Sequence, residues 1–202
     1  MTKKEIIWRE VLYQARVHKK TMFTQKELAL QFGASLSTVF NALKVPRDAH
    51  IIRMTGRGFV LESYAKLLYL WASSRSLRKD IRYQGYAPAR AAEIEGIMPP
   101  GVIFGLYSAF KYAFHTAPAE YDHVYVYADA RDIPAVVARL NTVGGAPKRG
   151  VQPNVFIVEA DPRLREYGEV HTALEQLFVD LWNAPEWYAK DFISSLKQTL
   201  DL

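Results

Sequence analysis

Polar side chains suited to binding nucleic acid are concentrated between residues 25 and 57. The set consists of hydroxyls, amides and cations, namely Gln25, Ser35, Ser37, Thr38, Asn41, Lys44, Arg53, Thr55 and Arg57. Hydroxyls and amides can hydrogen-bond to base edges in the major groove, and cations can neutralise phosphates. This pattern predicts contacts to double-stranded DNA.

Residues suited to catalysis or metal binding are sparse by comparison. The chain of 202 residues has no cysteine, which excludes disulfides, thiol catalysis and Cys-ligated zinc. Its five histidines form neither an HExxH motif nor a paired ligand spacing. The sequence also contains no P-loop, GxSxG or dinucleotide-binding motif. We therefore expect no cofactor, no metal ion and no enzymatic activity.

The elements that must position the polar residues begin with an amphipathic helix. Apolar residues recur at spacings of three and four from Lys4 to about His18, and this period predicts a helix. The water-facing side of this helix is expected to carry Arg9, Arg16 and Lys19.

A second and a third helix are expected to cross closely. Thr24 followed by Glu27 is a capping-box signature for the second helix, and Gly33 ends it. The third helix is expected over residues 35–44, because Pro46 forbids its continuation. A close crossing needs small residues, a turn residue that tolerates positive φ, and an apolar seam. These roles are assigned to Ala29, Gly33, Val39, Leu28, Leu36 and Leu43.

A hairpin is expected to follow the helices. Residues 50–54 and 59–61 are short apolar segments that flank a connection with two glycines at 56 and 58. The order of helix, helix, tight turn, helix and hairpin resembles a winged helix-turn-helix domain, which we place at residues 1–62. The resemblance implies a third helix in the major groove and a wing bearing Arg53 and Arg57 on phosphate or in the minor groove. Winged helices also serve as protein-interaction modules, and that alternative stays open.

The charge is distributed unevenly along the chain. Residues 1–82 carry sixteen Lys and Arg against six Asp and Glu, whereas residues 83–202 carry ten against fifteen. A basic first part beside an acidic second part is typical of a protein whose first part faces a polyanion.

The remainder of the chain predicts a connecting helix and a second domain. Residues 63–80 are expected to form the connecting helix, whose apolar face could serve a homodimer or pack internally. Residues 81–202 alternate strand-like and helical patterns, which predicts a mixed α/β regulatory or partner-binding domain and an α+β fold class overall. Within it, residues 144–150 are rich in glycine and are expected to form a loop.

A family resemblance extends over most of the chain. It is carried by the winged-helix pattern, by Gly105-Leu106-Tyr107-Ser108-Ala109, and by the segments at 175–181 and 187–193. With these features the chain resembles the AbiEi family of DNA-binding antitoxins of type IV toxin–antitoxin systems, and related prokaryotic transcription regulators. The resemblance implies a repressor that occludes its own promoter, a cognate toxin protein as partner, and a second domain of nucleotidyltransferase-like ancestry without catalysis.

That ancestry can be examined on the strand expected at 123–127. A nucleotidyltransferase needs two carboxylates one residue apart on this strand to hold two metal ions. Here Asp122 and Asp129 lie seven residues apart, and Tyr125 and Tyr127 occupy the middle. An active nucleotidyltransferase is therefore the less favoured alternative. We expect His123 and Asp122 to form a surface pair, and the tyrosines to belong to a core or an interface.

The expected location is the cytoplasm. No apolar run approaches the ~18–20 residues of a membrane span, and the residues after Met1 lead into no signal-like apolar segment. We therefore expect a protein that has no membrane partner.

Overall fold

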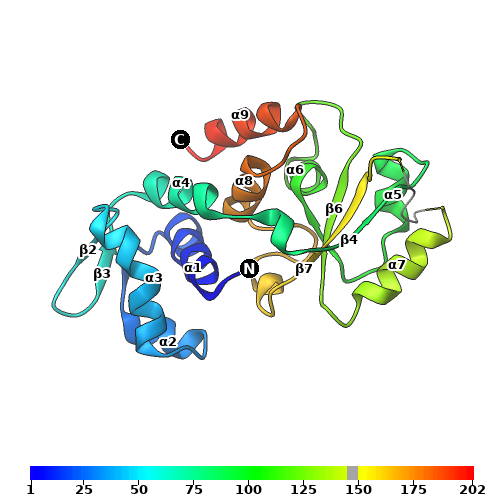
Figure 1. The fold of residues 1–202 in the computed structure, drawn as a ribbon. Helices are drawn as coiled ribbons and strands as arrows, with labels where there is room; N and C mark the ends of the chain where they lie inside the picture. Colours follow the sequence, from blue (N-terminus) through cyan, green and yellow to red (C-terminus); the bar gives the residue numbers. More distant parts are fainter. Residues whose placement is uncertain (145–149) are drawn as a thin grey trace. The chain divides into compact units, whose positions relative to one another are not determined.

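The computed structural model describes residues 1–144 and 150–202 and has a mixed α+β fold, as the sequence predicts (Figure 1). The chain divides into two compact units, Met1–Arg75 and Ser76–Leu202. The loop expected at 144–150 lies mostly outside the described residues. Within the described ranges, no helix has both the length and the apolar character that crossing a membrane requires.

The first unit combines helices with a small antiparallel sheet. Its elements in chain order are α1 (Lys3–Val17), β1 (Met22–Phe23), α2 (Gln25–Gln31), α3 (Leu36–Asp48), β2 (Ile52–Met54), β3 (Phe59–Leu61) and α4 (Tyr64–Ser74). The strand order is β1-β3-β2. β1 was not expected, because a strand of two residues is too short to show a period in the sequence.

Each helix of the first unit begins at a side-chain hydroxyl. Thr2, Thr24, Ser35 and Ser63 accept a hydrogen bond from the backbone N–H three residues later. This pattern satisfies one of the N–H groups that a helix start leaves without an intrahelical partner. The expected cap at Thr24 is therefore confirmed.

α3 continues four residues beyond the end expected from Pro46. Proline has no N–H to donate to the carbonyl of Ala42, four residues earlier, and this is why the sequence predicted a stop. The indole Nε1 of Trp8 donates to that carbonyl oxygen at 2.8 Å in a buried position. The hydrogen bond compensates the acceptor that Pro46 leaves open and joins α1 to α3.

α1 is more deeply buried than its amphipathic period predicted. Both α3 and α4 pack against it. Arg9, expected on the water-facing side, is 0% exposed, and Glu5 is buried near Arg75, with the Arg75 Nη1 atom 3.5 Å from Glu5 Oε1. An amphipathic pattern assumes one covered face, and α1 has more than one.

α4 belongs to the first unit. Residues 63–80 were expected to connect two domains, but Leu67, Leu68 and Trp71 are buried and α4 packs against α1. The first unit ends at Arg75, and the short 3-10 helix η1 (Leu77–Lys79) opens the second unit.

The second unit is built on a four-stranded mixed sheet of order β4-β7-β6-β5. Its strands are β4 (Ile81–Gly85), β5 (Ile103–Gly105), β6 (Val124–Ala128) and β7 (Val155–Glu159). β6 and β7 are parallel, whereas the β4–β7 and β5–β6 pairs are antiparallel. The helices are α5 (Ala91–Ile97), α6 (Leu106–Phe114), α7 (Ile133–Asn141), η2 (Leu164–Tyr167), α8 (Leu174–Trp182) and α9 (Ala189–Thr199).

Alternate residues of β6 face different layers. Val124 and Val126 pack in a core with residues of α5 and α7, such as Ile94 and Val136. The hydroxyl of Tyr127 donates instead to Asp180 of α8. Figure 1 shows α5 and α7 on one side of the sheet and α6, α8 and α9 on the other. The period of two in β6 therefore separates an aliphatic layer from a layer rich in tyrosine.

The Trp8–Ala42 hydrogen bond predicts a coupling that a double-mutant cycle can measure. Trp8→Phe removes the indole donor and leaves the buried carbonyl without its partner, which should lower the free energy of unfolding by about 1–3 kcal/mol. In a Pro46→Ala background the new N–H can donate to that carbonyl, so Trp8→Phe should cost about 1 kcal/mol less. Urea unfolding of the full chain measures both costs. Equal costs in the two backgrounds would contradict the proposed compensation.

The hairpin glycines predict unequal sensitivity to substitution. A Cβ at Gly58 would overlap the carbonyl oxygen of Phe23, whereas a Cβ at Gly56 meets nothing within 4 Å. Gly58→Ala should therefore destabilise the first unit by about 1–3 kcal/mol, as overpacking does. Gly56→Ala is the matched control and should change the thermal midpoint little. The hypothesis fails if the two variants melt alike.

Candidate functional site

The connection between α2 and α3 is a tight turn centred on Gly33. Gly33 has φ of +54°, in the left-handed region that favours glycine. The N–H of Ala34 donates to the carbonyl of Ala29 at 2.9 Å, which closes the turn against the end of α2. The positive φ expected at Gly33 is confirmed, and α2 and α3 pack against each other.

α3 has a buried face and an exposed face. The buried face consists of Val39, Ala42, Leu43 and Pro46. Three of the predicted contact residues, Ser37, Asn41 and Lys44, are exposed at spacings of four and three. Because these spacings place residues on the same side of a helix, their side chains form one polar row.

Two other predicted residues stabilise the start of α3. The hydroxyl of Ser35 accepts from the N–H of Thr38 at 3.1 Å and lies 2.9 Å from the Thr38 hydroxyl. Both side chains therefore use part of their hydrogen-bonding capacity within the helix cap. Gln25 lies at the first position of α2 and is half-buried, so it belongs to a different helix from the polar row.

The two arginines of the hairpin differ in whether they form an ion pair. Arg53 is paired with Glu62, with 2.6 Å between Nε and Oε1, in an exposed position. Thr55 closes the turn, since its N–H donates to Gly58 and its hydroxyl accepts from the Gly58 N–H. Arg57 is exposed at the turn and forms no ion pair with any residue that the structure describes. Arg57 is thus the cation of the hairpin whose charge is not compensated.

The exposure of two apolar residues on α3, Leu36 and Phe40, was not predicted from the sequence. Leu36 was expected in the seam between α2 and α3, but its exposed fraction is 56%. It occupies the first position of α3, where more than half of its surface is open to solvent. Phe40 is 44% exposed, and the guanidinium of Arg47 lies 5.3 Å from the centre of its ring. The i, i+4 spacing of Leu36 and Phe40 was the signal that could have identified this pair.

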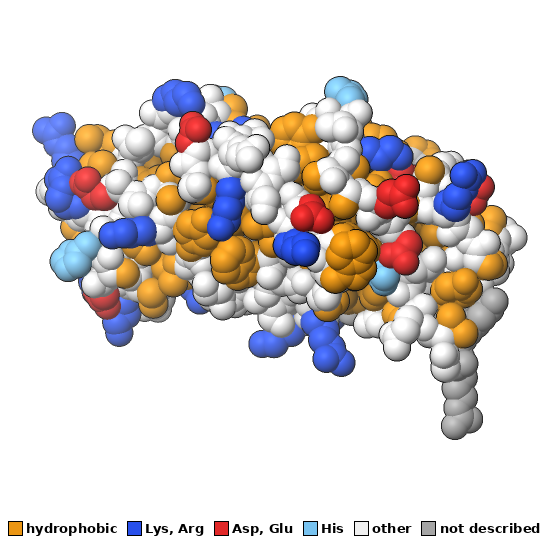
Figure 2. Space-filling view, turned by 90° about the horizontal axis from the view of Figure 1, so that it is seen from above, with side chains coloured by type: hydrophobic (Ala, Val, Ile, Leu, Met, Phe, Trp, Pro, Cys, Tyr) orange, Lys and Arg blue, Asp and Glu red, His pale blue; other side chains and the backbone are white. Residues whose placement is uncertain are grey.

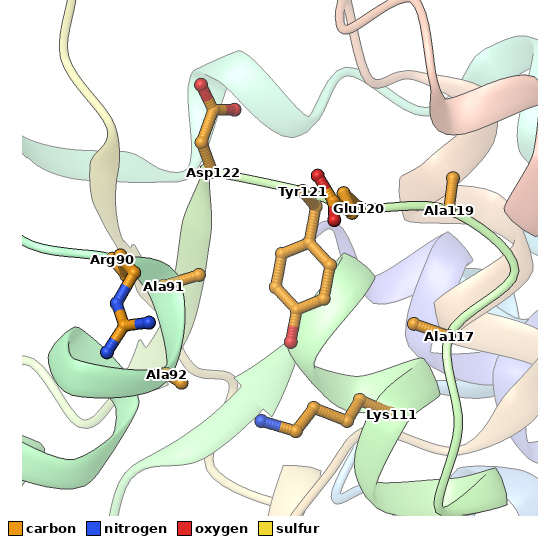
Figure 3. A pocket seen from close by; sticks show the side chains of 9 residues that line it. All are labelled: Arg90, Ala91, Ala92, Lys111, Ala117, Ala119, Glu120, Tyr121 and Asp122. Carbon is orange, nitrogen blue, oxygen red and sulfur yellow. The ribbon is translucent and has the colours of Figure 1, made fainter.

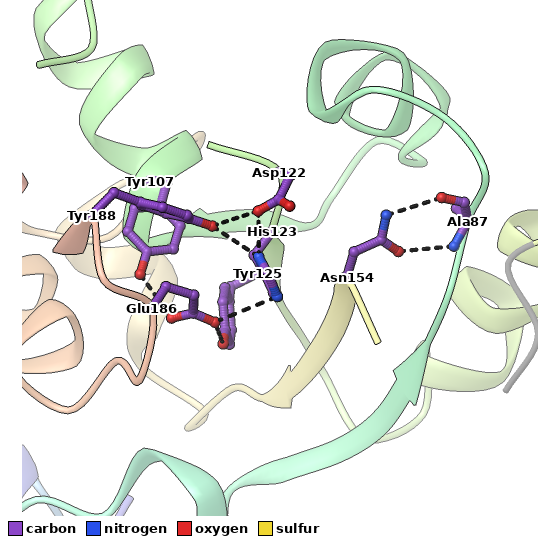
Figure 4. A network of polar contacts seen from close by, with 8 residues as sticks. All are labelled: Ala87, Tyr107, Asp122, His123, Tyr125, Asn154, Glu186 and Tyr188. Carbon is purple, nitrogen blue, oxygen red and sulfur yellow. Dashed lines mark hydrogen bonds and ion pairs between the residues drawn. The ribbon is translucent and has the colours of Figure 1, made fainter. Parts of the chain in front are cut away.

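The second unit contains a network of polar contacts among tyrosine, histidine and acidic side chains, drawn in Figure 4. The hydroxyls of Tyr107 and Tyr125 each donate to Glu186 at 2.7 Å. The hydroxyl of Tyr188 lies 2.8 Å from Asp122, and His123 Nδ1 lies 2.6 Å from the same carboxylate. Burial, and then the negative charge of Glu186, raise the pKa of Tyr107 and Tyr125 far above the ordinary value. The network ties the segment before α9 to β6.

A shallow hollow of about 510 Å³ lies beside this network and is shown in Figure 3. Its lining includes the cations Arg90 and Lys111. Arg90 pairs with Glu93 at 3.1 Å, and Lys111 pairs with Glu95 at 2.7 Å. The hydroxyl of Tyr121 also donates to Glu95. Since both cations are already paired, the hollow does not have the character of an anion site.

The two tyrosines in the middle of β6 form hydrogen bonds to other elements of the second unit. Tyr125 and Tyr127 donate to Glu186 and Asp180, at 2.7 and 2.5 Å. Asp122 and Asp129 lie beyond the two ends of the tyrosine pair, and Asp129 is 3.6 Å from Arg165. In the part of the chain that the structure describes, no group of three or more His, Asp or Glu residues could hold a metal ion.

Comparison of the chain with family models, with curated proteins and with solved structures gave no match. Function is therefore inferred from the geometry described above. The exposed row on α3, together with Arg57, is the candidate functional site.

The tyrosine network predicts a cooperative alkaline transition. Because the pKa of Tyr107 and Tyr125 is raised in the folded chain, their contribution to stability is complete below pH ~10, the ordinary tyrosine value, and is lost as the pH rises above it. The tyrosinate absorbance of these residues should appear together with the loss of circular dichroism, and Tyr125→Phe should reduce that step. Full tyrosine ionisation with unchanged circular dichroism would contradict this expectation.

Proposed function

We propose that this chain is a sequence-specific DNA-binding transcriptional regulator. The observation that carries the proposal is the row of Ser37, Asn41 and Lys44 on the exposed face of α3. The order of α1, α2, α3 and the β2–β3 hairpin supports assigning the first unit as a winged helix-turn-helix. In this assignment α3 enters the major groove and α2 crosses the backbone.

The charge of the first unit supports a polyanionic partner. Residues 1–75 carry thirteen Lys and Arg against five Asp and Glu. Phosphate neutralisation releases counterions, so the affinity should fall steeply with salt concentration. Arg57 on the hairpin would contact phosphate or the minor groove and add affinity that is independent of sequence. The exposed Arg53–Glu62 pair is worth only about 0–1 kcal/mol, and Arg53 can exchange Glu62 for a phosphate.

We assign the regulator to the AbiEi antitoxin type, a repressor that acts by promoter occlusion and has a cognate toxin as partner. The support is the resemblance of Gly105–Ala109 and of residues 175–193 to that family. Tyr125 and Tyr127 stand in the middle of β6, where a nucleotidyltransferase carries its paired carboxylates. This substitution supports a second unit that regulates or binds a partner without catalysis.

A specific observation favours a second candidate function, the docking of another protein on α3. Leu36 and Phe40 are exposed on this helix, and apolar side chains gathered on a surface are typical of protein interfaces. The two functions differ in their salt dependence and in their response to loss of Asn41, whose amide suits an adenine edge.

Two substitutions should weaken DNA binding in different ways. Asn41→Ala should reduce affinity for a selected duplex by about 1–3 kcal/mol and leave random duplex binding unchanged, because its amide reads a base edge. Arg57→Ala should weaken binding to both duplexes alike and lower the salt slope by about one, because it loses a phosphate contact. Fluorescence anisotropy of the full chain across a salt series measures both effects.

Matched controls come from exposed residues outside the proposed interface. Lys66→Ala removes one charge from α4, and Gln198→Ala removes one amide from α9. Neither control should alter specific binding. Absence of any duplex binding at low salt would refute the DNA proposal and favour protein docking.

A further inference from the structure

The apolar pair on α3 lies next to the polar row and is solvent-exposed. Leu36 is 56% exposed and Phe40 is 44% exposed, one helical turn apart. Asn41 directly follows Phe40, and Ser37 directly follows Leu36. The exposed face of α3 therefore offers donors, acceptors and apolar contact together. Hydrophobic side chains also reach the surface elsewhere among those of Lys and Arg, as Figure 2 shows from above the view of Figure 1.

In the major groove, only one base presents an apolar group. Thymine carries a C5-methyl group that phenylalanine and other apolar side chains can contact, whereas adenine offers the donor and acceptor that an asparagine amide matches. Because an A·T pair presents both features, an apolar residue beside an asparagine suits this pair. Uracil has the same hydrogen-bonding edge as thymine but lacks the methyl group.

We propose, on the basis of the proposed function, that Phe40 and Leu36 determine specificity by contacting thymine C5-methyl groups. Four residues of helix span about 6 Å, and successive bases of one strand are about 3.4 Å apart along the axis. The two side chains therefore reach thymines about two steps apart. Asn41 reads an adenine beside the methyl group that Phe40 contacts.

Arg47 is a positioning residue for this contact. Its guanidinium lies 5.3 Å from the centre of the Phe40 ring, and its Nη2 atom lies 3.0 Å from Asp48 Oδ1. A cation held over an aromatic face is attracted by the ring quadrupole, which restricts the ring. The ion pair with Arg47 also compensates the negative charge of Asp48, which is the one acidic residue of α3.

The surroundings of the apolar pair favour DNA over a protein partner. The exposed face also carries Lys44, Ser37 and Asn41, and the first unit has an excess of eight basic over acidic residues. A protein-docking face is instead expected to have an apolar centre depleted of charged residues. An exposed apolar residue does not by itself indicate a partner, and Leu30, which is 84% exposed, lies on α2 and not on α3. Leu30 therefore provides the matched control.

The test uses the full chain and a random-sequence duplex pool from which bound sites are selected. Each thymine of the selected site is then replaced in turn by deoxyuridine. Removal of one contacted methyl group should weaken wild-type binding about fourfold at one or two positions, the value expected for one buried methyl group. Phe40→Ala should bind more weakly and lose the response to deoxyuridine at its position. Leu30→Ala should behave as wild type.

The outcomes separate this inference from the function on which it rests. Equal wild-type affinity for every deoxyuridine probe, with specific binding that still requires Asn41, would overturn the thymine contact and leave the DNA-binding function standing. Failure to select any duplex at low salt would overturn both and assign the apolar pair to a protein partner. The deoxyuridine series on the wild-type chain requires no variant to fold and by itself can overturn the thymine contact, whereas the comparison of Phe40→Ala with Leu30→Ala assigns that contact to its side chain.

Discussion

The hydrogen bond from the Trp8 indole to the Ala42 carbonyl sets the arrangement of the first unit. Pro46 frees this carbonyl within a buried part of α3, and a buried acceptor without a partner is costly. The indole can satisfy it only if α1 lies against the side of α3 that contains Ala42 and Pro46. That constraint turns the opposite side, with Asn41 and Lys44, toward solvent. The proposed interface thus depends on a contact that contains none of its residues.

The features that could be predicted from the sequence depend on neighbouring residues. Thr24 caps α2 through an N–H three residues away, and Gly33 tolerates a φ of +54° by itself. The hairpin at 52–61 follows from short apolar segments around glycines. Exposure of Asn41 and Lys44 follows from the period of α3. In each case the residues that determine the feature lie close together in the sequence, so that a local pattern is sufficient to predict it.

The features that could not be predicted depend on partners far away in the sequence. Trp8 and Ala42 are 34 residues apart, and Tyr107 and Glu186 are 79 residues apart. Local patterns therefore placed the end of α3 before Pro46 and gave the tyrosines no partner. Exposure of Leu36 and burial of Arg9 depend on how the elements of the first unit pack against one another. Contacts between residues so far apart in the sequence form only in the completed fold.

The two units differ in how much hydrogen-bonding capacity remains for a ligand. In the second unit, Tyr107, Tyr125 and Glu186 satisfy one another, and further reaction there would have to break a buried network. On α3 the side chains of Asn41 and Lys44 face solvent, where a groove can meet them without such a cost. Recognition needs groups that are held in place but are not consumed by the fold. By that criterion we propose that binding takes place on the exposed face of α3, whose backbone is fixed by its buried side.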